Sequence, residues 1–476
     1  MLPPSLPNSE RQPPAKTDVT PCADWLIVFA RFPEPGRTKT RLIPALGPER
    51  AAQLQAALTR HTLAVAGHLC ADRSHRVEVR YTGGNVDQMS QLYGNEHDYV
   101  PQQGDDLGER LNDAAAAAFR AGAKQVVLIG TDCPGLDADR LHAAFQALQR
   151  SDIVLGPAFD GGYYLIGLSG HHPALFAGID WGTEHVLRQT LAKIRASRFR
   201  VHLLPMLADV DHPEDLIECR RFGNCFGEIL PDTRPDLLSI IVPTLNEEST
   251  LAATLGPLSR VPGVELIVAD GGSTDATVSI ARELGALVVP ARKGRGRQLN
   301  AGAAFASGET LLFLHADSQL PPDFVGAIRS TLDQPHIAGA FRLRIGASGW
   351  SLRCVEWAAN LRSRLWQMPY GDQGLFIPAE VFFAMGGYPN WPLMEDYELC
   401  RRLRRRGRIA LAQEAIETSA RRWTTLGVVR TTLINQSTLL GFHLGISPER
   451  LAAWYSGWSR RGRPDKSSDG RSPEPE

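Results

Sequence analysis

Three short apolar segments in the second half of the chain end at side chains that could do chemistry. Polar residues at the carboxyl ends of parallel strands lie where open α/β sheets bind ligands. Carboxylates there suit the hydroxyls of a nucleoside or a divalent metal on its phosphates. Taken singly, each acid would also be explained as a helix N-cap, a position that Asp and Asn favour. The segments and their polar ends are residues 238–242 with Asn246 and Glu247, residues 266–269 with Asp270 and Asp275, and residues 311–314 with Asp317.

Two adjacent acids, Glu395 and Asp396, open the segment EDYELCRRLRRRG, which has a helical pattern. A carboxylate in such a place can act as a general base that takes the proton of an attacking hydroxyl. The alternative is structural, because acids favour the first turn of any helix. The arginines in residues 401–408 are better explained as a solvated face at the negative end of this helix than as a nucleic-acid patch.

The first half of the chain has a cluster of cations instead. Residues 31–41 (RFPEPGRTKTR) follow an apolar segment and place Arg31, Lys39 and Arg41 in a loop with Gly and Pro. Backbone amides at a helix start, together with these cations, would bind a diphosphate or triphosphate. A solvated basic loop explains the segment equally well, and the GxxxxGK[ST] pattern of a P-loop is absent.

A repeated alternation of strands and helices must position these residues. Short runs rich in Val, Ile and Leu alternate with Ala-rich segments of helical length, which favours buried parallel strands in βα units. The length of 476 residues suits two domains. We therefore expect two doubly wound α/β domains in tandem. The expected parts are a disordered tail (1–22), a first domain (23–222), a linker rich in Gly and Pro (223–236), a second domain (237–458) and a second disordered tail (459–476).

Composition narrows the expected partners and location. The net charge is -1, so no overall field attracts nucleic acid, and we expect none as a partner. Seven cysteines without a CxxC pair, and no signal-like apolar run near the start, favour the cytoplasm. The apolar residues 424–446 are too interrupted by polar groups to span a bilayer, but they remain a candidate for peripheral membrane contact.

The second half of the chain resembles the family 2 glycosyltransferases, which have the GT-A fold of nucleotide-diphospho-sugar transferases. The resemblance covers nearly all of residues 238–425 and is most similar to the branch often labelled arsenosugar-biosynthesis glycosyltransferases. It rests on motifs in the family's order, namely residues 243–247, 270–275, 293–302 (KGRGRQLNAG), 315–317, 371–374 (GDQG), 386–388 and 394–396.

This resemblance implies a transferase of the EC 2.4 type that moves a sugar from a nucleotide-sugar donor to a hydroxyl acceptor with inversion. It implies Mg²⁺ or Mn²⁺ on Asp317, although the usual DxD motif begins here with His315, which leaves one acid for the metal. Asp396 is the implied catalytic base, with Glu395 beside it in the catalytic pair. The residues implied in donor binding are Asn246, Glu247, Asp270, Asp275, Arg297, Arg422 and Trp423.

The first half, over residues 25–220, resembles the DUF2064 group, a GT-A-like family similar to guanylyltransferases. The resemblance rests on residues 130–134, 156–164 and 209–216. It implies nucleotide binding at Arg31, Lys39 and Arg41, and activity of the EC 2.7.7 type. Alternatives are a second glycosyltransferase or an idle regulatory binding module. The implied metal ligands are Asp132 and Asp211, and the implied substrate-side turn is Asp160, Gly161 and Gly162.

Overall fold

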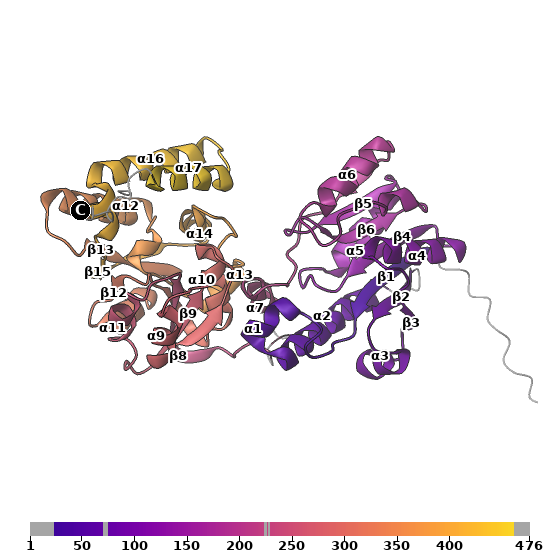
Figure 1. Ribbon diagram of the computed structural model, residues 1–476, viewed down its shortest axis with the longest axis horizontal. Coiled ribbons are helices and arrows are strands. Elements are labelled where there is room, and N and C mark those ends of the chain that lie inside the picture. The colour runs from indigo at the N-terminus through magenta and orange to yellow at the C-terminus, as the bar shows by residue number, and fades with distance from the viewer. Residues whose placement is uncertain (1–22, 70–74, 223–225, 227–228, 461–476) are drawn as a thin grey trace, which may run out of the picture. The chain divides into compact units, whose positions relative to one another are not determined.

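A computed structural model describes residues 23–69, 75–222, 226 and 229–460, which form two compact units (Figure 1). The first unit contains residues 23–32 and 59–207, and the second contains residues 33–58 and 208–460. The predicted tail 1–22 lies outside the described residues, as does the predicted tail 459–476 beyond the last two residues of α17. The domain and linker boundaries expected from the sequence stay predictions.

The first unit is built on a seven-stranded sheet of order β3-β2-β1-β4-β6-β5-β7. All pairs are parallel except those of β6, which runs antiparallel to β4 and β5. The strands are β1 (Asp24–Arg31), β2 (His75–Thr82), β3 (Asp98–Pro101), β4 (Gln125–Gly130), β5 (Ile153–Pro157), β6 (Tyr163–Leu168) and β7 (Val201–Leu203). The main helices are α3 (Val86–Tyr93), α4 (Leu107–Arg120), α5 (Ala138–Leu148) and α6 (Val186–Ala196), while α2 (Pro48–Leu69) belongs partly to each unit.

The second unit is built on an eight-stranded sheet of order β10-β9-β8-β11-β14-β13-β15-β12. Here β14 is antiparallel to its neighbours, and so is the two-residue strand β12 to β15. The strands are β8 (Arg234–Thr244), β9 (Val264–Asp270), β10 (Leu287–Pro290), β11 (Gly308–Phe313), β12 (Ser318–Gln319), β13 (Ala338–Ile345), β14 (Leu375–Pro378) and β15 (Ile409–Thr418).

The two sheets have the same topology. Numbered in chain order without β12, the strands of the second sheet lie in the order third, second, first, fourth, sixth, fifth and seventh, as in the first sheet. The sixth strand is the antiparallel one in both. The expectation of two GT-A-like α/β domains in tandem is therefore confirmed.

The continuous apolar runs in the sequence arise because helices cover both faces of each sheet. In β8, Ile241 packs into one buried cluster, whereas Ile240 and Val242 pack into another. In β1, Ile27 likewise faces away from Leu26 and Val28. Successive residues of a strand point to opposite faces, so a strand between two helical layers needs apolar residues at every position.

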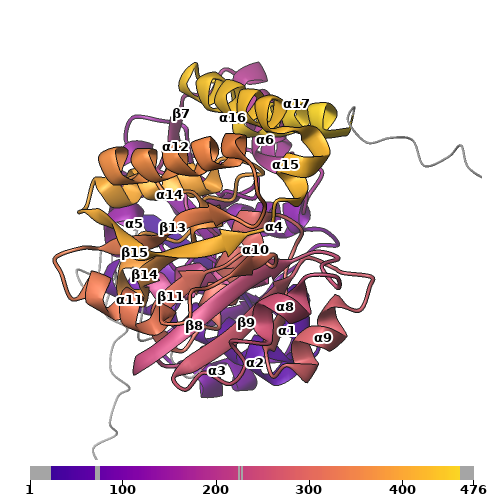
Figure 2. The ribbon, with the colours of Figure 1, turned by 90° about the vertical axis from the view of Figure 1, so that its left-hand side faces the viewer.

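Helices of the second unit occupy distinct places around its sheet (Figure 2). α12 packs on β13 and β15, and α16 lies beside α17. The helices are α1 (Ile43–Leu46), α7 (Leu216–Arg221), α8 (Leu251–Leu255), α9 (Thr277–Glu283), α10 (Arg295–Ala304), α11 (Phe324–Leu332), α12 (Trp350–Trp366), α13 (Ala379–Ala384), α14 (Glu395–Arg404), α15 (Arg421–Leu426), α16 (Val428–His443) and α17 (Pro448–Arg460).

Candidate functional site

The loops after β8 and β9 are tied together by the polar residues that the sequence singled out. Asn246 adopts a left-handed backbone conformation (φ 58°), which Asn tolerates better than most residues. Its side-chain oxygen accepts a hydrogen bond from the backbone N–H of Thr274 at 2.9 Å. Asp275 accepts from the backbone N–H groups of Thr277 and Glu248. Asn246 and Asp275 therefore order the rim of the site.

Asp270 is buried at the end of β9, and both of its carboxylate oxygens have partners within the site's own loops. One oxygen accepts from the backbone N–H groups of Gly272 and Ser273, both at 3.0 Å. The other accepts from the hydroxyls of Ser273 and Thr244. These bonds fix the turn after the strand, so in this state Asp270 shapes the loop, and the nucleotide contact expected for it stays a prediction.

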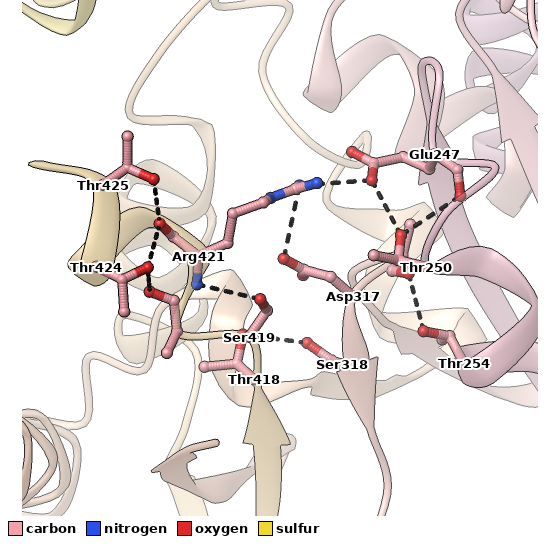
Figure 3. A network of polar contacts seen from close by, with 12 residues as sticks. Glu247, Thr250, Thr254, Asp317, Ser318, Thr418, Ser419, Arg421, Thr424 and Thr425 are labelled. Carbon is pink, nitrogen blue, oxygen red and sulfur yellow. Dashed lines mark hydrogen bonds and ion pairs between the residues drawn. The ribbon is translucent and has the colours of Figure 1, made fainter. Parts of the chain in front are cut away.

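Glu247 and Asp317 reach the same cation (Figure 3). Nη2 of Arg421 lies 3.5 Å from Oε2 of Glu247 and 3.9 Å from Oδ2 of Asp317. Burial raises the pKa of Asp317, Arg421 lowers it, and the nearby Glu247 raises it again. Arg421 is absent from the residues assigned a role from the sequence, although it is the neighbour of Arg422.

The expected catalytic base, Asp396, lies at the start of α14 in a buried polar cluster. Nη2 of Arg295 lies 2.9 Å from its Oδ2, and the backbone N–H of Gly371 donates to the same oxygen at 3.2 Å. A side chain at residue 371 would collide with the Arg295 guanidinium, which explains the glycine. The other oxygen, Oδ1, is buried and has no hydrogen-bond partner among the described residues. Asp396 thus has one anchored oxygen and one that is available.

More acids than cations surround Arg295. Oε1 of Glu395 lies 3.8 Å from Nε of Arg295, and burial together with Asp396 raises the pKa of Glu395 to about 7. Burial also raises the pKa of Asp372, whose Oδ1 is another buried oxygen without a hydrogen-bond partner in the described chain. Like charges that cannot all be solvated favour retention of a proton. The cluster is therefore a place where protons can be held near Asp396.

His315 stands where a DxD motif would place its first acid, and it does not contribute a charge. Burial and the neighbouring Arg295 hold its pKa well below the ordinary value, so the imidazole is neutral near pH 7. Its Nε2 is buried and lacks a hydrogen-bond partner in the described part of the chain. Among the described residues, no group of three or more His, Cys, Asp or Glu side chains is arranged to hold a metal. A metal here would depend on Asp317, the neighbouring Glu247 and phosphate oxygens.

The remaining residues expected at the donor site lie apart from these two clusters. Arg297 is half-buried and donates to Oδ1 of Asn390 at 3.3 Å. Trp423 is partly buried against a small apolar cluster that includes Leu343 and Leu352. The side chain of Arg422 lies outside the described part of the structure. Their donor contacts stay predictions.

Sequence reasoning did not assign roles to Arg295, Asp372 or Arg421. Two of them lie inside motifs that carry the family resemblance, residues 293–302 and 371–374. The motifs were thus a usable signal, but a motif with several cations does not tell which one faces the acids. Arg295 pairs with Glu395 and Asp396, whereas Arg297, two positions further along α10, hydrogen-bonds to Asn390.

In the basic loop after β1, two of the cations are paired with an acid. Nζ of Lys39 lies 3.0 Å from Oδ1 of Asp211, and Nη1 of Arg41 lies 3.2 Å from Oδ2. Burial opposes ionisation of Asp211, but Lys39 and Arg41 outweigh it and hold its pKa below the ordinary value. Lys39 and Arg41, which were expected to bind phosphate, are thus paired in this state with Asp211, which was expected to bind a metal.

The other residues expected to act in the first half lie at strand ends of the first unit. Arg31 ends β1 and is exposed, and Asp132 follows β4. Asp160 accepts from the backbone N–H of Gly162 at 2.8 Å, which closes the turn after β5. A side chain at residue 161 would collide with the backbone of Glu184, so this turn requires Gly161 (φ 92°). The roles of these residues in binding stay predictions.

The fold and the polar clusters define a class of protein, a tandem of two GT-A-like domains with acids at the strand ends. Residues 47–183 match the family described as "Uncharacterized protein conserved in bacteria (DUF2064)", and residues 239–387 match "Glycosyl transferase family 2". Both resemblances are confirmed. The chain therefore joins a segment that matches DUF2064 to a segment that matches family 2 glycosyltransferases.

Two similar glycosyltransferases match this chain over only part of their own length. A glucosyl-3-phosphoglycerate synthase of Mycobacterium tuberculosis is 36% identical over 109 residues, which are 20% of this chain and 34% of the relative. A PGL/p-HBAD biosynthesis glycosyltransferase of Mycobacterium bovis is 40% identical over 93 residues, which are 18% and 36%. The chain therefore spans about a third of the length of these two relatives.

Two solved structures are also similar. A nucleotide-diphospho-sugar transferase structure from Desulfovibrio desulfuricans G20 has 35% identity and a TM-score of 0.40, and the match covers 42% of this chain and 88% of that one. The synthase from Mycobacterium tuberculosis, in complex with Mn²⁺, UDP and glucosyl-3-phosphoglycerate, has 23% identity and a TM-score of 0.30, with coverage of 43% and 73%.

Proposed function

We propose that the second unit transfers a sugar from a nucleotide-sugar donor to a hydroxyl acceptor, with inversion at the anomeric carbon and with Asp396 as the base. The observation that carries this proposal is the state of the Asp396 carboxylate. Arg295 and the Gly371 amide hold one oxygen, while the other is buried and has no partner among the described residues. A base must be oriented and must keep a lone pair for the incoming proton.

In the proposed reaction, Oδ1 of Asp396 takes the proton of the acceptor hydroxyl while that oxygen attacks the anomeric carbon. The bond between this carbon and the donor's diphosphate oxygen breaks, and the nucleoside diphosphate leaves with the electron pair. Arg295 keeps Asp396 in place through their ion pair. The neighbouring Glu395, with its pKa raised to about 7, supplies a second protonatable group of the catalytic pair.

A divalent metal is part of the proposal. The chemistry of Asp317 and Glu247 fits Mg²⁺ or Mn²⁺, because hard cations take one or two carboxylates together with phosphate oxygens and water. When bound, such an ion would offset the charge that develops on the leaving diphosphate. Asp317→Ala is expected to weaken metal-dependent donor binding. Asn246, Asp270 and Asp275 would support the nucleotide from the loops after β8 and β9.

The test is to incubate the full chain with a panel of nucleotide-sugars, metal and hydroxyl acceptors, and to follow release of nucleoside diphosphate. Nuclear magnetic resonance of the product then gives its anomeric configuration. Product with the opposite configuration to the donor is expected. Product with the donor's configuration would reject the single-displacement mechanism with Asp396, and no transfer to any acceptor would reject the proposed activity.

For the first half, we propose binding of a nucleotide with Mg²⁺ and a nucleotidyltransferase activity. The sequence supports it, because Arg31, Lys39 and Arg41 lie in the basic segment 31–41 and Asp132 follows the apolar segment 126–130. Exchange of labelled pyrophosphate into a nucleoside triphosphate would support it. Nucleotide binding without exchange would favour a second glycosyltransferase, and no binding by calorimetry would favour an idle regulatory module.

We also propose that the protein works in the cytoplasm, without nucleic acid, and contacts membranes peripherally through residues 424–446. No helix in the described part of the chain is long and apolar enough to cross a bilayer. However, α16 exposes Val429 (73%), Leu433 (61%) and Leu440 (60%), and Leu444 at its C-cap is 74% exposed. Co-sedimentation of the chain with liposomes is expected, and its loss in Val429→Ser/Leu444→Ser would place the contact. A chain that stays in the supernatant at every lipid composition would reject it.

A further inference from the structure

A guanidinium occupies the position between two carboxylates that come from separate loops. Glu247 follows β8, Asp317 follows β11, and both carboxylates lie within 4.0 Å of one nitrogen of Arg421. Figure 3 shows the long side chain of Arg421 extending from α15 toward the two acids. The remaining contacts of Arg421 are made by its backbone, with Ser419 on one side and the hydroxyls of Thr424 and Thr425 on the other.

The two acids need a positive charge between them. Each carboxylate side chain is only 23% exposed, so water screens their repulsion incompletely. That repulsion is one cause of the raised pKa of Asp317. In this state Arg421 supplies the positive charge, yet its side chain is 57% exposed and pairs with no other side chain among the described residues. An exposed arginine on a long flexible stem can leave at small cost.

We propose that Arg421 is an internal counter-ion, which occupies the place of the metal between Glu247 and Asp317 and must be displaced when a divalent cation binds. This inference rests on the proposed function, since the metal belongs to the proposed donor site. Arg421 competes with the metal for the same two carboxylates. This competition lowers the affinity of the two carboxylates for a metal ion. It also keeps their charge neutralised until a divalent cation binds.

The physical consequence is a change in metal affinity that requires no turnover. Removing Arg421 leaves both carboxylates uncompensated, so a divalent cation binds them without first breaking two ion pairs. Pairs as exposed as these are weak, and we expect Mn²⁺ to bind roughly three to ten times more tightly in Arg421→Ala than in the natural chain. Arg421→Lys retains a cation and should give a smaller gain. Because the two ion pairs of Arg421 are partly exposed, added salt should reduce the difference in Mn²⁺ affinity between Arg421→Ala and the natural chain.

The experiment measures Mn²⁺ alone, without donor or acceptor, by electron paramagnetic resonance of the free ion in the presence of the full chain. Asp317→Ala identifies the binding that belongs to this site. In that variant, the decrease of the free-ion signal caused by this site should be absent. Arg344→Ala is the matched control, since Arg344 is a similarly exposed arginine that pairs with Glu417 at 3.6 Å and with neither of the two acids. It should leave the affinity for Mn²⁺ unchanged.

An affinity in Arg421→Ala that equals or falls below that of the natural chain would overturn the counter-ion proposal. If Asp317→Ala also leaves Mn²⁺ binding unchanged, no metal is held at this site, and the metal part of the proposed function fails as well. Sugar transfer by the same protein sample reports separately on the proposed activity. Circular dichroism of Arg421→Ala and Arg421→Lys verifies that both variants are folded.

Discussion

The two sheets of this protein have one topology and carry different chemistry at equivalent positions. After the fourth strand, the first sheet has Asp132 and the second has Asp317. Between the fifth and sixth strands, the first has a short turn with Asp160, whereas the second has the long helix α12 and the segment with Asp372. The difference shows that topology fixes where acids can gather, while the connections decide what surrounds them.

Burial is the main physical contrast. The second unit encloses Arg295 among Glu395, Asp396 and Asp372, and several polar atoms there have no partner within the described residues. In the first unit, Asp160 is exposed and its carboxylate closes a surface turn. An enclosed charge cluster stabilises or destabilises the fold strongly, and an exposed turn does not. The predictions below test this contrast.

The largest expected effect comes from removing the enclosed cation. Arg295→Met leaves three neighbouring acids without compensation, and we expect the free energy of unfolding to fall by about 3 to 5 kcal/mol, as for other broken buried pairs. Urea unfolding followed by tryptophan fluorescence measures it. Arg297→Met, on the same helix but with Asn390 as the hydrogen-bond partner in place of an acid, is the matched control and should cost far less. Equal losses in the two variants would show that the cluster is not a buried ion-pair network.

The next effect is on catalysis. Asp396→Asn keeps the shape of the side chain but cannot accept the acceptor's proton, so kcat should fall at least about a hundredfold, with donor affinity nearly unchanged. Initial rates and donor titrations measure the two quantities. Asp333→Asn, an exposed acid at the end of α11, is the control. Weak donor binding with normal turnover at saturation would mean that Asp396 is not the base.

The third effect is a pH dependence of stability. The pKa of Glu395 is raised from 4.5 to about 7, so between these values the folded chain keeps a proton that the unfolded chain has lost. Stability from this group is therefore present below pH 4.5 and is lost as the pH rises toward 7. Glu395→Gln should remove about 2 to 3 kcal/mol of the fall in unfolding free energy between pH 5 and pH 8.

Urea unfolding at several pH values measures this dependence, with Glu309→Gln on the exposed side of β11 as the control. A Glu395→Gln variant that shows the same pH dependence as the natural chain would place the titration elsewhere. The contrast with the first unit is then sharpened, since Asp160 is exposed and its carboxylate accepts from the Gly162 amide.

The smallest effect concerns the first half of the chain. If Lys39 binds phosphate and Asp132 binds Mg²⁺, the metal offsets the repulsion between carboxylate and phosphate. Nucleotide binding and Mg²⁺ binding then depend on each other. Lys39→Ala and Asp132→Ala should each lower the affinity for Mg²⁺-nucleotide roughly tenfold, the worth of one charge-assisted hydrogen bond. Calorimetry measures it. The loss in Asp132→Ala should shrink when Mg²⁺ is omitted, and unchanged binding in both variants would reject the site.

Much of the fold could be predicted from the sequence because strands covered on both faces leave a strong signal. The apolar runs at residues 26–30, 126–130, 238–242, 266–269 and 311–314 all fall in or across the ends of strands. The strand order could not be read in this way, since sequence periodicity says that a strand is buried but not which strand lies beside it. The shared topology of the two sheets became visible only in three dimensions.

For the candidate site, the sequence determined which residue types follow which strands, and therefore that Glu247 and Asp317 are acids near the carboxyl edge of a sheet, while Asp396 was recognised at the start of a helix. Only the tertiary structure decided their partners. Arg295 lies 101 positions from Asp396, and Arg421 lies 174 positions from Glu247 and 104 positions from Asp317, so no local pattern links these pairs. Ion pairing depends on distance and burial in space, and the packing of separate loops sets both.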